Sequence, residues 1–233
     1  MNNNLLQIKV KQRLNKLSSS DFDNLECWMI AEAFNKAQVE WCRRQLHGNN
    51  IFKESDEQTT TRVDDLETLI TTKDLSGNLV DTYFQSSTLP SNYMKFKRVS
   101  IKGKSIECDE RPFKVYPAQE ADVDELLSDV NKCPSFDWAE TFCTLAGNSI
   151  KIYTDNKFIV INPKLTYYRL PRPVQFKGCI DIIKEELFSD DQESELKDDV
   201  VESIIDEACA ILAGDIENML QVQRNTQSAE RDN

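Results

Sequence analysis

The stretch Ser149–Val174 reads SIKIYTDNKFIVINPKLTYYRLPRPV, and its pattern is that of extended chain. Residues 150–153 alternate isoleucine with other side chains, which is the period of a half-buried strand, and residues 158–161 form a largely β-branched run. The turn-forming residues between these two runs predict a hairpin. Asn162-Pro163 is expected to break the ladder, because proline has no N–H to donate. A further extended segment is predicted at residues 165–170.

Helical periodicity is predicted on both sides of this stretch. The expected helices are Leu5–Leu17, Phe22–Leu46, Asp56–Thr72, Ala118–Asn131 and Leu196–Gln223. The fourth of these is expected to turn Val123, Leu126, Leu127 and Val130 inward. A strand-like pattern covers Leu79–Lys102, and further strands are expected at Phe113–Pro117 and Thr141–Leu145. Residues 176–188 fit either a strand or a short helix.

These elements predict an α+β fold. The N-terminal and C-terminal helices are expected to pack through their apolar stripes into a helical core, with the β-rich middle as an insertion. The expected domains are residues 1–78 with the N-terminal helices, 79–183 with the β-rich insertion, and 184–233. The last of these combines an acidic segment with the C-terminal helix that completes the helical core.

The composition favours a protein that is made and kept in a cytosol. Apolar residues make up 39% of the 233 residues and charged residues 29%, which suits a thin core or large surfaces reserved for partners. There is no run of eighteen apolar residues, so no transmembrane helix is predicted. The N-terminus lacks the basic start and apolar centre of a signal peptide.

Seven cysteines are scattered along the chain without a Cys-x-x-Cys pair. An odd count without a secretion signal predicts free, mostly buried thiols rather than a disulfide framework. Zinc binding is not expected, since no ligand spacing matches and the chain has one histidine, His47. No metal and no other cofactor is therefore predicted.

The net charge of −12 is concentrated in one segment. Residues 181–217 hold fourteen Asp and Glu against two Lys, which is already −12, so the rest of the chain is close to neutral. Non-specific binding to duplex DNA through phosphate neutralisation is therefore not expected of the whole molecule. The segment is interpreted as a solvated acidic face, or as a surface that meets a basic partner or keeps passing DNA from sticking.

A basic strip precedes the middle of the chain. Its members are Lys95, Lys97, Arg98, Lys102 and Lys104. Such a strip is typical of a solvent-exposed face, and it is also able to meet an acidic neighbour or nucleic-acid phosphates. The candidate interface residues are this strip and four acidic residues near the C-terminus, namely Asp198, Asp199, Asp215 and Glu217.

The residues offer little catalytic chemistry. His47 has no second histidine to work with, so a catalytic triad is not predicted. Gly103-Lys104-Ser105 matches only the end of a phosphate-binding loop, because Arg98 stands where the first glycine belongs. Two aspartate pairs occur, Asp122 with Asp124 and Asp190 with Asp191. A carboxylate metal site for phosphodiester cleavage is the strongest enzymatic alternative, and the chain is expected not to be an enzyme.

An ordered set of motifs resembles one protein family. The motifs are Leu89–Val99 (LPSNYMKFKRV), Ile150–Tyr153 (IKIY), Leu165–Pro173 (LTYYRLPRP), Ile205–Cys209 (IDEAC) and Gly214–Glu217 (GDIE). The set is similar to structural proteins of tailed phages that infect Bacteroidetes, especially a ring protein of the head-to-tail connector of crAss-like phages. The likeness covers residues 14–223, and the order of the motifs is more specific than any one of them. The family has no catalytic residues to carry over.

The resemblance implies a subunit of a multimeric ring beneath the portal, bridging the capsid vertex and the tail. The implied partners are the portal protein, neighbouring neck and tail rings, and further copies of the chain in a twelve-fold ring. Double-stranded DNA would pass through without sequence-specific binding, and no membrane is involved. The implied location is the virion, after assembly in the cytoplasm of the bacterial host.

Copies that meet head-to-tail around an axis use two different, complementary faces. The basic strip at 95–104 and the acidic region at 181–217 are a candidate pair of such faces. The nearest alternative within the same class is another tail-proximal ring or a tail-completion protein. The alternative from a different class is a small carboxylate-metal nuclease.

Overall fold

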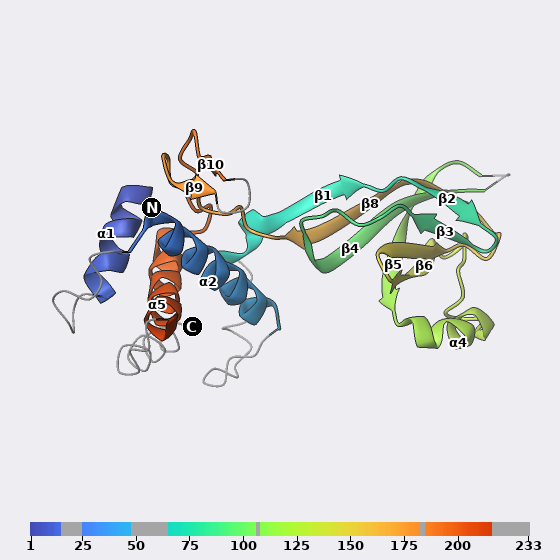
Figure 1. The fold of residues 1–233 in the computed structure, drawn as a ribbon. Helices are drawn as coiled ribbons and strands as arrows, with labels where there is room; N and C mark the ends of the chain where they lie inside the picture. Colours follow the sequence, from blue (N-terminus) through green and yellow to red (C-terminus); the bar gives the residue numbers. More distant parts are fainter. Residues whose placement is uncertain (15–24, 48–64, 106–107, 182–184, 216–233) are drawn as a thin grey trace. The chain divides into compact units, whose positions relative to one another are not determined.

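The computed structural model describes residues 1–14, 25–47, 65–105, 108–181 and 185–215, and it separates the chain into two compact units (Figure 1). The sheet unit is the single stretch Leu69–Leu170. The terminal unit consists of Met1–Thr68 and Pro171–Asn233, which come from the two ends of the chain. Each unit has its own buried residues.

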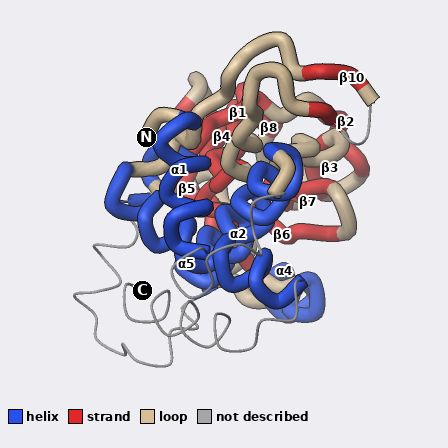
Figure 2. Tube along the Cα trace, turned by 60° about the vertical axis from the view of Figure 1, so that its left-hand side comes forward, coloured by secondary structure: helices blue, strands red, loops and turns tan. Residues whose placement is uncertain are grey.

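The sheet unit is built around a curled, eight-stranded sheet that forms a half-barrel. Its strands are β1 (Ile70–Asp74), β2 (Gly77–Val80), β3 (Tyr83–Ser86), β4 (Tyr93–Lys104), β5 (Arg111–Ala118), β6 (Glu140–Ala146), β7 (Ser149–Tyr153) and β8 (Ile159–Arg169). They are hydrogen-bonded in the order β1-β8-β4-β5-β6-β7-β3-β2. β5 and β6 run parallel, and the segment that joins them contains the 3-10 turn η2 (Glu120–Asp122) and helix α4 (Val123–Ser128), near β6 in Figures 1 and 2.

The predicted helical core with a β-rich insertion is wrong. The curled sheet dominates the fold, and the described residues form only four short α-helices, α1, α2, α4 and α5. The prediction failed because the amphipathic stripes of two helices are clearer in the sequence than the patterns of several short strands. Several of these strands pair with partners far away in the sequence, as β1 does with β8, and no local period reveals such pairing.

The predicted hairpin at residues 150–161 is also wrong. β7 pairs with β3 and β6, whereas β8 pairs with β1 and β4. The turn between β7 and β8 was predicted correctly, since Asp155 and Asn156 take left-handed φ angles of 50° and 57°. That turn carries the chain to another part of the sheet instead of folding it back on its neighbour.

Pro163 lies inside β8 and does not end it. The register of β8 against β4 shifts between Ser100 and Lys102, so a bulge in the ladder accommodates the proline. Asn162, next to it, has a φ of 48°. The carbonyl of Pro163 still accepts a hydrogen bond from the N–H of Leu75 at 2.8 Å. The ladder therefore loses one donor and continues.

One bent stretch of chain forms both edges of the sheet. β1 and β2 are separated only by Leu75 and Ser76, yet they pair with β8 and β3 at opposite ends of the strand order. Leu75 is buried, and the carbonyl of Ser76 accepts a hydrogen bond from the N–H of Ser87 at 2.6 Å. The covalent chain thus holds the two ends of the curl together around the core.

Aromatic rings fill the inside of the curl. The centroid of the Phe113 ring lies 4.4 Å from that of Phe158 and 5.8 Å from that of Phe136. Gly103 on β4 faces this ring, and a Cβ at that position would come within 2.3 Å of it. Because the ring is held by its neighbours, only glycine leaves room for it. The buried cluster also includes Val99, Ile101, Cys143, Ile150, Ile152, Leu165 and Tyr167.

The short strands largely follow the prediction. The pattern at 79–102 corresponds to β2, β3 and β4, and the strands expected at 113–117 and 141–145 lie within β5 and β6. Three details are wrong. Ile70–Thr72 belong to β1 rather than to a helix. The helix expected at 118–131 is limited to α4 at Val123–Ser128, since Ala118 belongs to β5. None of the four residues expected to point inward is fully buried, and the side chain of Val130 is 88% exposed. Residues 56–64 of the expected helix lie outside the described residues.

The terminal unit contains α1 (Asn3–Leu14), α2 (Cys27–His47), α5 (Asp198–Asp215) and the paired strands β9 (Ile180–Asp181) and β10 (Glu186–Leu187). α5 packs against both α1 and α2. The buried apolar residues of α2 include Ile30, Phe34, Ala37 and Trp41, and those of α5 include Val201, Ile204, Ile205 and Ala208. Residues 176–188, which fit either a strand or a short helix, thus contain the two strands β9 and β10. The predicted helix residues 15–17, 22–24 and 216–223 lie outside the described part.

The prediction that the cysteines are free thiols is wrong for two of them. Cys27, the first residue of α2, forms a disulfide with Cys179, immediately before β9, with a Cα–Cα distance of 6.0 Å. The partners are 152 residues apart, so no spacing rule pairs them. The remaining five are free, and Cys42, Cys143 and Cys209 are buried as expected. Burial raises the pKa of each of these three thiols to about 12.

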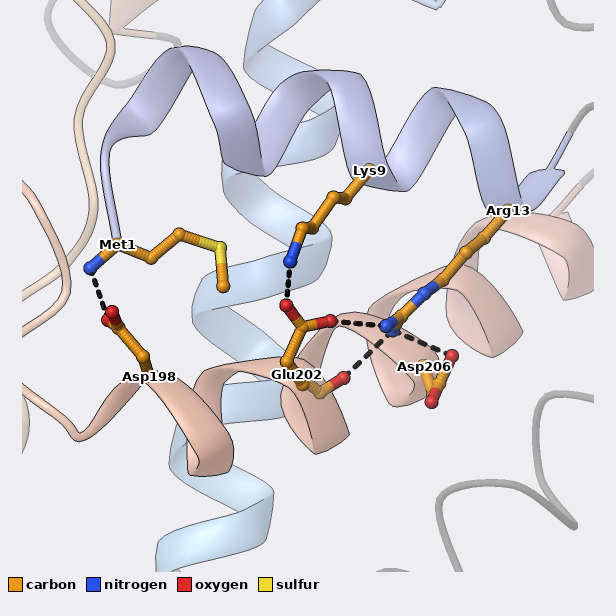
Figure 3. A network of polar contacts seen from close by, with 6 residues as sticks. All are labelled: Met1, Lys9, Arg13, Asp198, Glu202 and Asp206. Atoms are coloured by element: carbon orange, nitrogen blue, oxygen red, sulfur yellow. Dashed lines mark hydrogen bonds and ion pairs between the residues drawn. The ribbon is translucent and has the colours of Figure 1, made fainter.

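Ion pairs fix α1 against α5 (Figure 3). Arg13 bridges two acids of α5, since its Nη1 lies 2.7 Å from Asp206 Oδ1 and its Nη2 donates to Glu202. Glu202 also accepts a hydrogen bond from Lys9, and the N-terminal amine lies 2.6 Å from Asp198 Oδ1. Much of the acidic charge of α5 is thus neutralised inside the terminal unit.

Glu207 on α5 gives the terminal unit a pH dependence. Burial raises the pKa of Glu207 to about 7, above its ordinary 4.5, with Arg44 opposing and Glu40 reinforcing the shift. The folded chain therefore holds this proton more tightly than the unfolded chain does. The resulting stability is fully present below pH 4.5 and is lost as the pH rises through about 7.

We expect the free energy of unfolding of the terminal unit to fall by on the order of 2 kcal/mol over this pH range because Glu207 becomes charged. Glu207→Gln should remove this fall in the free energy of unfolding with pH. Urea denaturation at several pH values measures it. A Glu193→Gln variant, at an exposed position of the same unit, should keep the wild-type profile. A Glu207→Gln profile identical to the wild type would rule out this origin.

Candidate interface on the outer face of β4 and β8

The strand β4 has one buried face and one charged face. Val99, Ile101 and Gly103 are buried, whereas Lys102 and Lys104 are exposed. Since successive side chains point to opposite faces of a strand, the two lysines leave the sheet on its outer side. The apolar residues of the same strand fix this orientation, because they fill the core.

A bulge adds two further cations to the outer side. The register of β4 against β8 shifts between Phe96 and Arg98, and both Lys97 and Arg98 are exposed. The Nζ of Lys97 lies 5.3 Å from the centroid of the Tyr168 ring on β8, within the range of a cation–π contact. Lys95 lies opposite Tyr168 in the register.

β8 supplies a sixth cation that the sequence pattern missed. Lys164 lies opposite Ser100 of β4, and its neighbour Leu165 is fully buried, so Lys164 faces outward. The alternation around Leu165 and Tyr167 indicates this direction in the sequence. Its closeness to the basic strip follows only from the pairing of β8 with β4. We call Lys95, Lys97, Arg98, Lys102, Lys104 and Lys164 the basic face.

Acids near the basic face neutralise it weakly. Lys102 Nζ lies 3.8 Å from Glu110 Oε2, and Lys164 Nζ lies 3.6 Å from Asp74 Oδ1. All four of these side chains are more than 40% exposed, and exposed ion pairs of this length are worth little. The basic face therefore presents a positive field to solvent.

The predicted acidic candidates belong to the other unit. Asp198 pairs with the N-terminal amine, and Asp199 is exposed in the first turn of α5. The side chain of Asp215 and the whole of Glu217 lie outside the described residues. Asp198 thus already has a partner, although its side chain stays 75% exposed. Four cations of the basic strip, Lys97, Arg98, Lys102 and Lys104, are exposed as well.

The geometry of the basic face suits electrostatic binding. Cations on a paired strand are held at fixed spacing, which favours an extended anionic surface made of carboxylates or phosphates. The described residues contain no cluster of three His, Cys, Asp or Glu able to hold a metal ion. Of the aspartates considered for a metal site, Asp191 accepts hydrogen bonds from Asn3 and from the N–H of Lys177, which lower its pKa.

No protein-family model matches the chain, and no curated protein matches it significantly. Among the helices that the structure describes, none has the length and apolar character needed to cross a membrane. No related protein therefore bears on the basic face, which is defined only by residues of this chain.

Proposed function

We propose that the chain is a structural virion protein, a subunit of a multimeric ring in the head-to-tail connector of a tailed phage. In this role it bridges the portal and the tail and surrounds the path of the DNA. The proposal combines the ordered motifs of the sequence with a folded sheet that presents one strongly charged outer face. Its partners are the portal protein, the adjoining ring proteins and further copies of itself.

The basic face carries the proposal. Six cations stand on the outer side of two paired strands in a chain whose net charge is −12. Because the backbone of paired strands is already ordered, binding of a partner restricts the side chains of these cations but not the backbone that carries them. Such a face sets orientation and partner choice, which is what a subunit needs when it must join its neighbours in one register.

The charge of the whole molecule agrees with passage of DNA without tight binding. A net charge of −12 repels the duplex at long range. The basic face is then expected to be covered by protein in the assembled ring, where carboxylates of a neighbour replace solvent. If the chain is instead another tail-proximal ring or a tail-completion protein, the same basic face binds a different neighbouring protein.

Purified virions test this proposal. The chain should be present in particles made by the same genome, at a fixed ratio to the portal protein, and should stay with the portal vertex when the capsid is disrupted. Quantitative mass spectrometry of the vertex fraction measures that ratio. A chain produced in infected cells but absent from purified particles would contradict the proposal.

A further inference from the structure

A second exposed surface lies on the sheet unit around the segment that joins β5 to β6. A hollow of about 280 Å³ there is lined by apolar side chains that include Tyr116, Leu126, Val130 and Trp138. Val130 is 88% exposed and Trp138 80% exposed, and half of Tyr116 is in contact with solvent. Large apolar side chains gathered around a hollow are typical of a protein-binding surface.

The segment that supplies much of the lining of this hollow is acidic. Residues 118–140 contain seven Asp and Glu against Lys132, a balance of −6. Lys132 pairs with Asp129 at 3.6 Å, and Glu120 and Glu140 pair with lysines of the sheet. Among the described ion pairs none involves Asp122, Asp124, Glu125 or Asp137, which are all exposed. The charged residues that line the hollow are Glu140 and Lys132, and the exposed acids Glu125 and Asp137 directly precede the lining residues Leu126 and Trp138 in the sequence. We call the hollow with these acids the acidic hollow.

The basic face and the acidic hollow are separate surfaces of one folded unit. The strands β8 and β4 carry the basic face, while the hollow is lined by residues of β5, of β6 and of the segment that joins them, and β5 follows β4 in the strand order. The segment 93–104 has a charge of +5 and no acid, and the segment 118–140 has −6. Their charges are nearly equal and opposite, although the whole unit is close to neutral.

We propose that the acidic hollow receives the basic face of a second copy of this chain. Trp138 and Val130 would lie against the aliphatic parts of the lysines, and the exposed acids of segment 118–140 would meet Lys97, Arg98 and Lys102. This inference deepens the proposed ring function and rests on it for the presence of neighbouring copies. The two surfaces differ, so the contact is head-to-tail, the kind that generates rings.

The contact replaces the pairing of the basic strip with residues 181–217. Lys9, Arg13, Arg44 and the N-terminal amine already pair with acids of α5. Of the acids in segment 118–140, Glu120, Asp129 and Glu140 pair with lysines, whereas Asp122, Asp124, Glu125 and Asp137 appear in none of the ion pairs between described residues. These four acids can therefore meet a new cation without giving up an existing ion pair.

Charge reversal tests the contact on the full-length chain by sedimentation velocity at low and high salt. One variant carries Lys97→Glu with Arg98→Glu, and another carries Asp124→Lys with Glu125→Lys. Each should weaken self-association about tenfold or more, because like charges then face each other. A matched control, Asp190→Lys with Glu193→Lys in the terminal unit, should associate like the wild type.

Restoring opposite charges across the contact gives the decisive test. The two reversal variants mixed together, and the chain carrying all four substitutions, should again associate as the wild type does. Thermal unfolding shows whether each variant is folded. Trp138→Ala, which leaves the charge unchanged, should also weaken association. Unaltered association of either reversal variant, failure of the mixture to associate, or a wild type that stays monomeric would overturn the inference.

The outcome separates this inference from the proposed function. A chain that joins the portal vertex while both reversal variants assemble normally would keep the ring function and reject the contact. A chain that self-associates through these surfaces but never occurs in virions would keep the contact and reject the ring function.

Discussion

Loss of the Cys27–Cys179 disulfide is expected to lower the free energy of unfolding of the terminal unit by about 2–4 kcal/mol. The bond ties the start of α2 to the paired strands β9 and β10 across 152 residues. Closing so long a loop removes many conformations from the unfolded chain, and the whole sheet unit lies within the loop. Breaking the bond returns that freedom to the unfolded state.

Denaturation in urea, with and without a reductant, measures this effect. The double variant Cys27→Ala with Cys179→Ala should unfold at the same lower denaturant concentration in both conditions. Cys108→Ala, at an exposed free cysteine, should behave as the wild type. Alkylation of the unreduced, unfolded chain should modify five thiols, and modification of all seven would show that the disulfide does not form.

Phe113→Ala is expected to destabilise the sheet unit by about 3–5 kcal/mol. The ring lies between those of Phe158 and Phe136 and fills the space that Gly103 leaves open. Its removal leaves a cavity at the centre of the curl. The surrounding strands are held by their ladders and by the bend at Leu75, so the cavity cannot collapse fully.

Hydrogen exchange measured by mass spectrometry gives a readout for the sheet unit alone. Phe113→Ala should accelerate exchange of β4, β5 and β8 together, while Phe113→Leu should cost less because it keeps most of the volume. Ile159→Ala, at a position 57% exposed on β8, provides the surface control. Equal exchange in Phe113→Ala and Ile159→Ala would contradict the position assigned to the ring.

Local patterns revealed the elements better than their arrangement. The basic strip was interpreted as a solvent-exposed face, and Lys102 and Lys104 are indeed exposed on β4. The stripes of α2 and α5 were likewise identified from the spacing of residues such as Ile30 and Ile204, which are buried. These features depend on neighbours within one element, so a single sequence contains the information.

Features that depend on distant pairing were missed. Pro163 was expected to end a strand, but a bulge with Asn162 at a left-handed φ carries β8 through it. Lys164 joins the basic face only because β8 lies beside β4. The disulfide was missed for the same reason, since 152 residues separate its cysteines. The α+β helical core failed because helical periodicity is stronger, residue for residue, than the signal of short strands.

Native mass spectrometry of the 26.8 kDa chain, alone and mixed with the portal protein of the same genome, tests the central claim most directly. The account predicts a portal-bound assembly whose mass corresponds to a closed ring of chains, and its loss when Lys97 and Arg98 are replaced by glutamate. A chain that remains monomeric and ignores the portal would contradict the account.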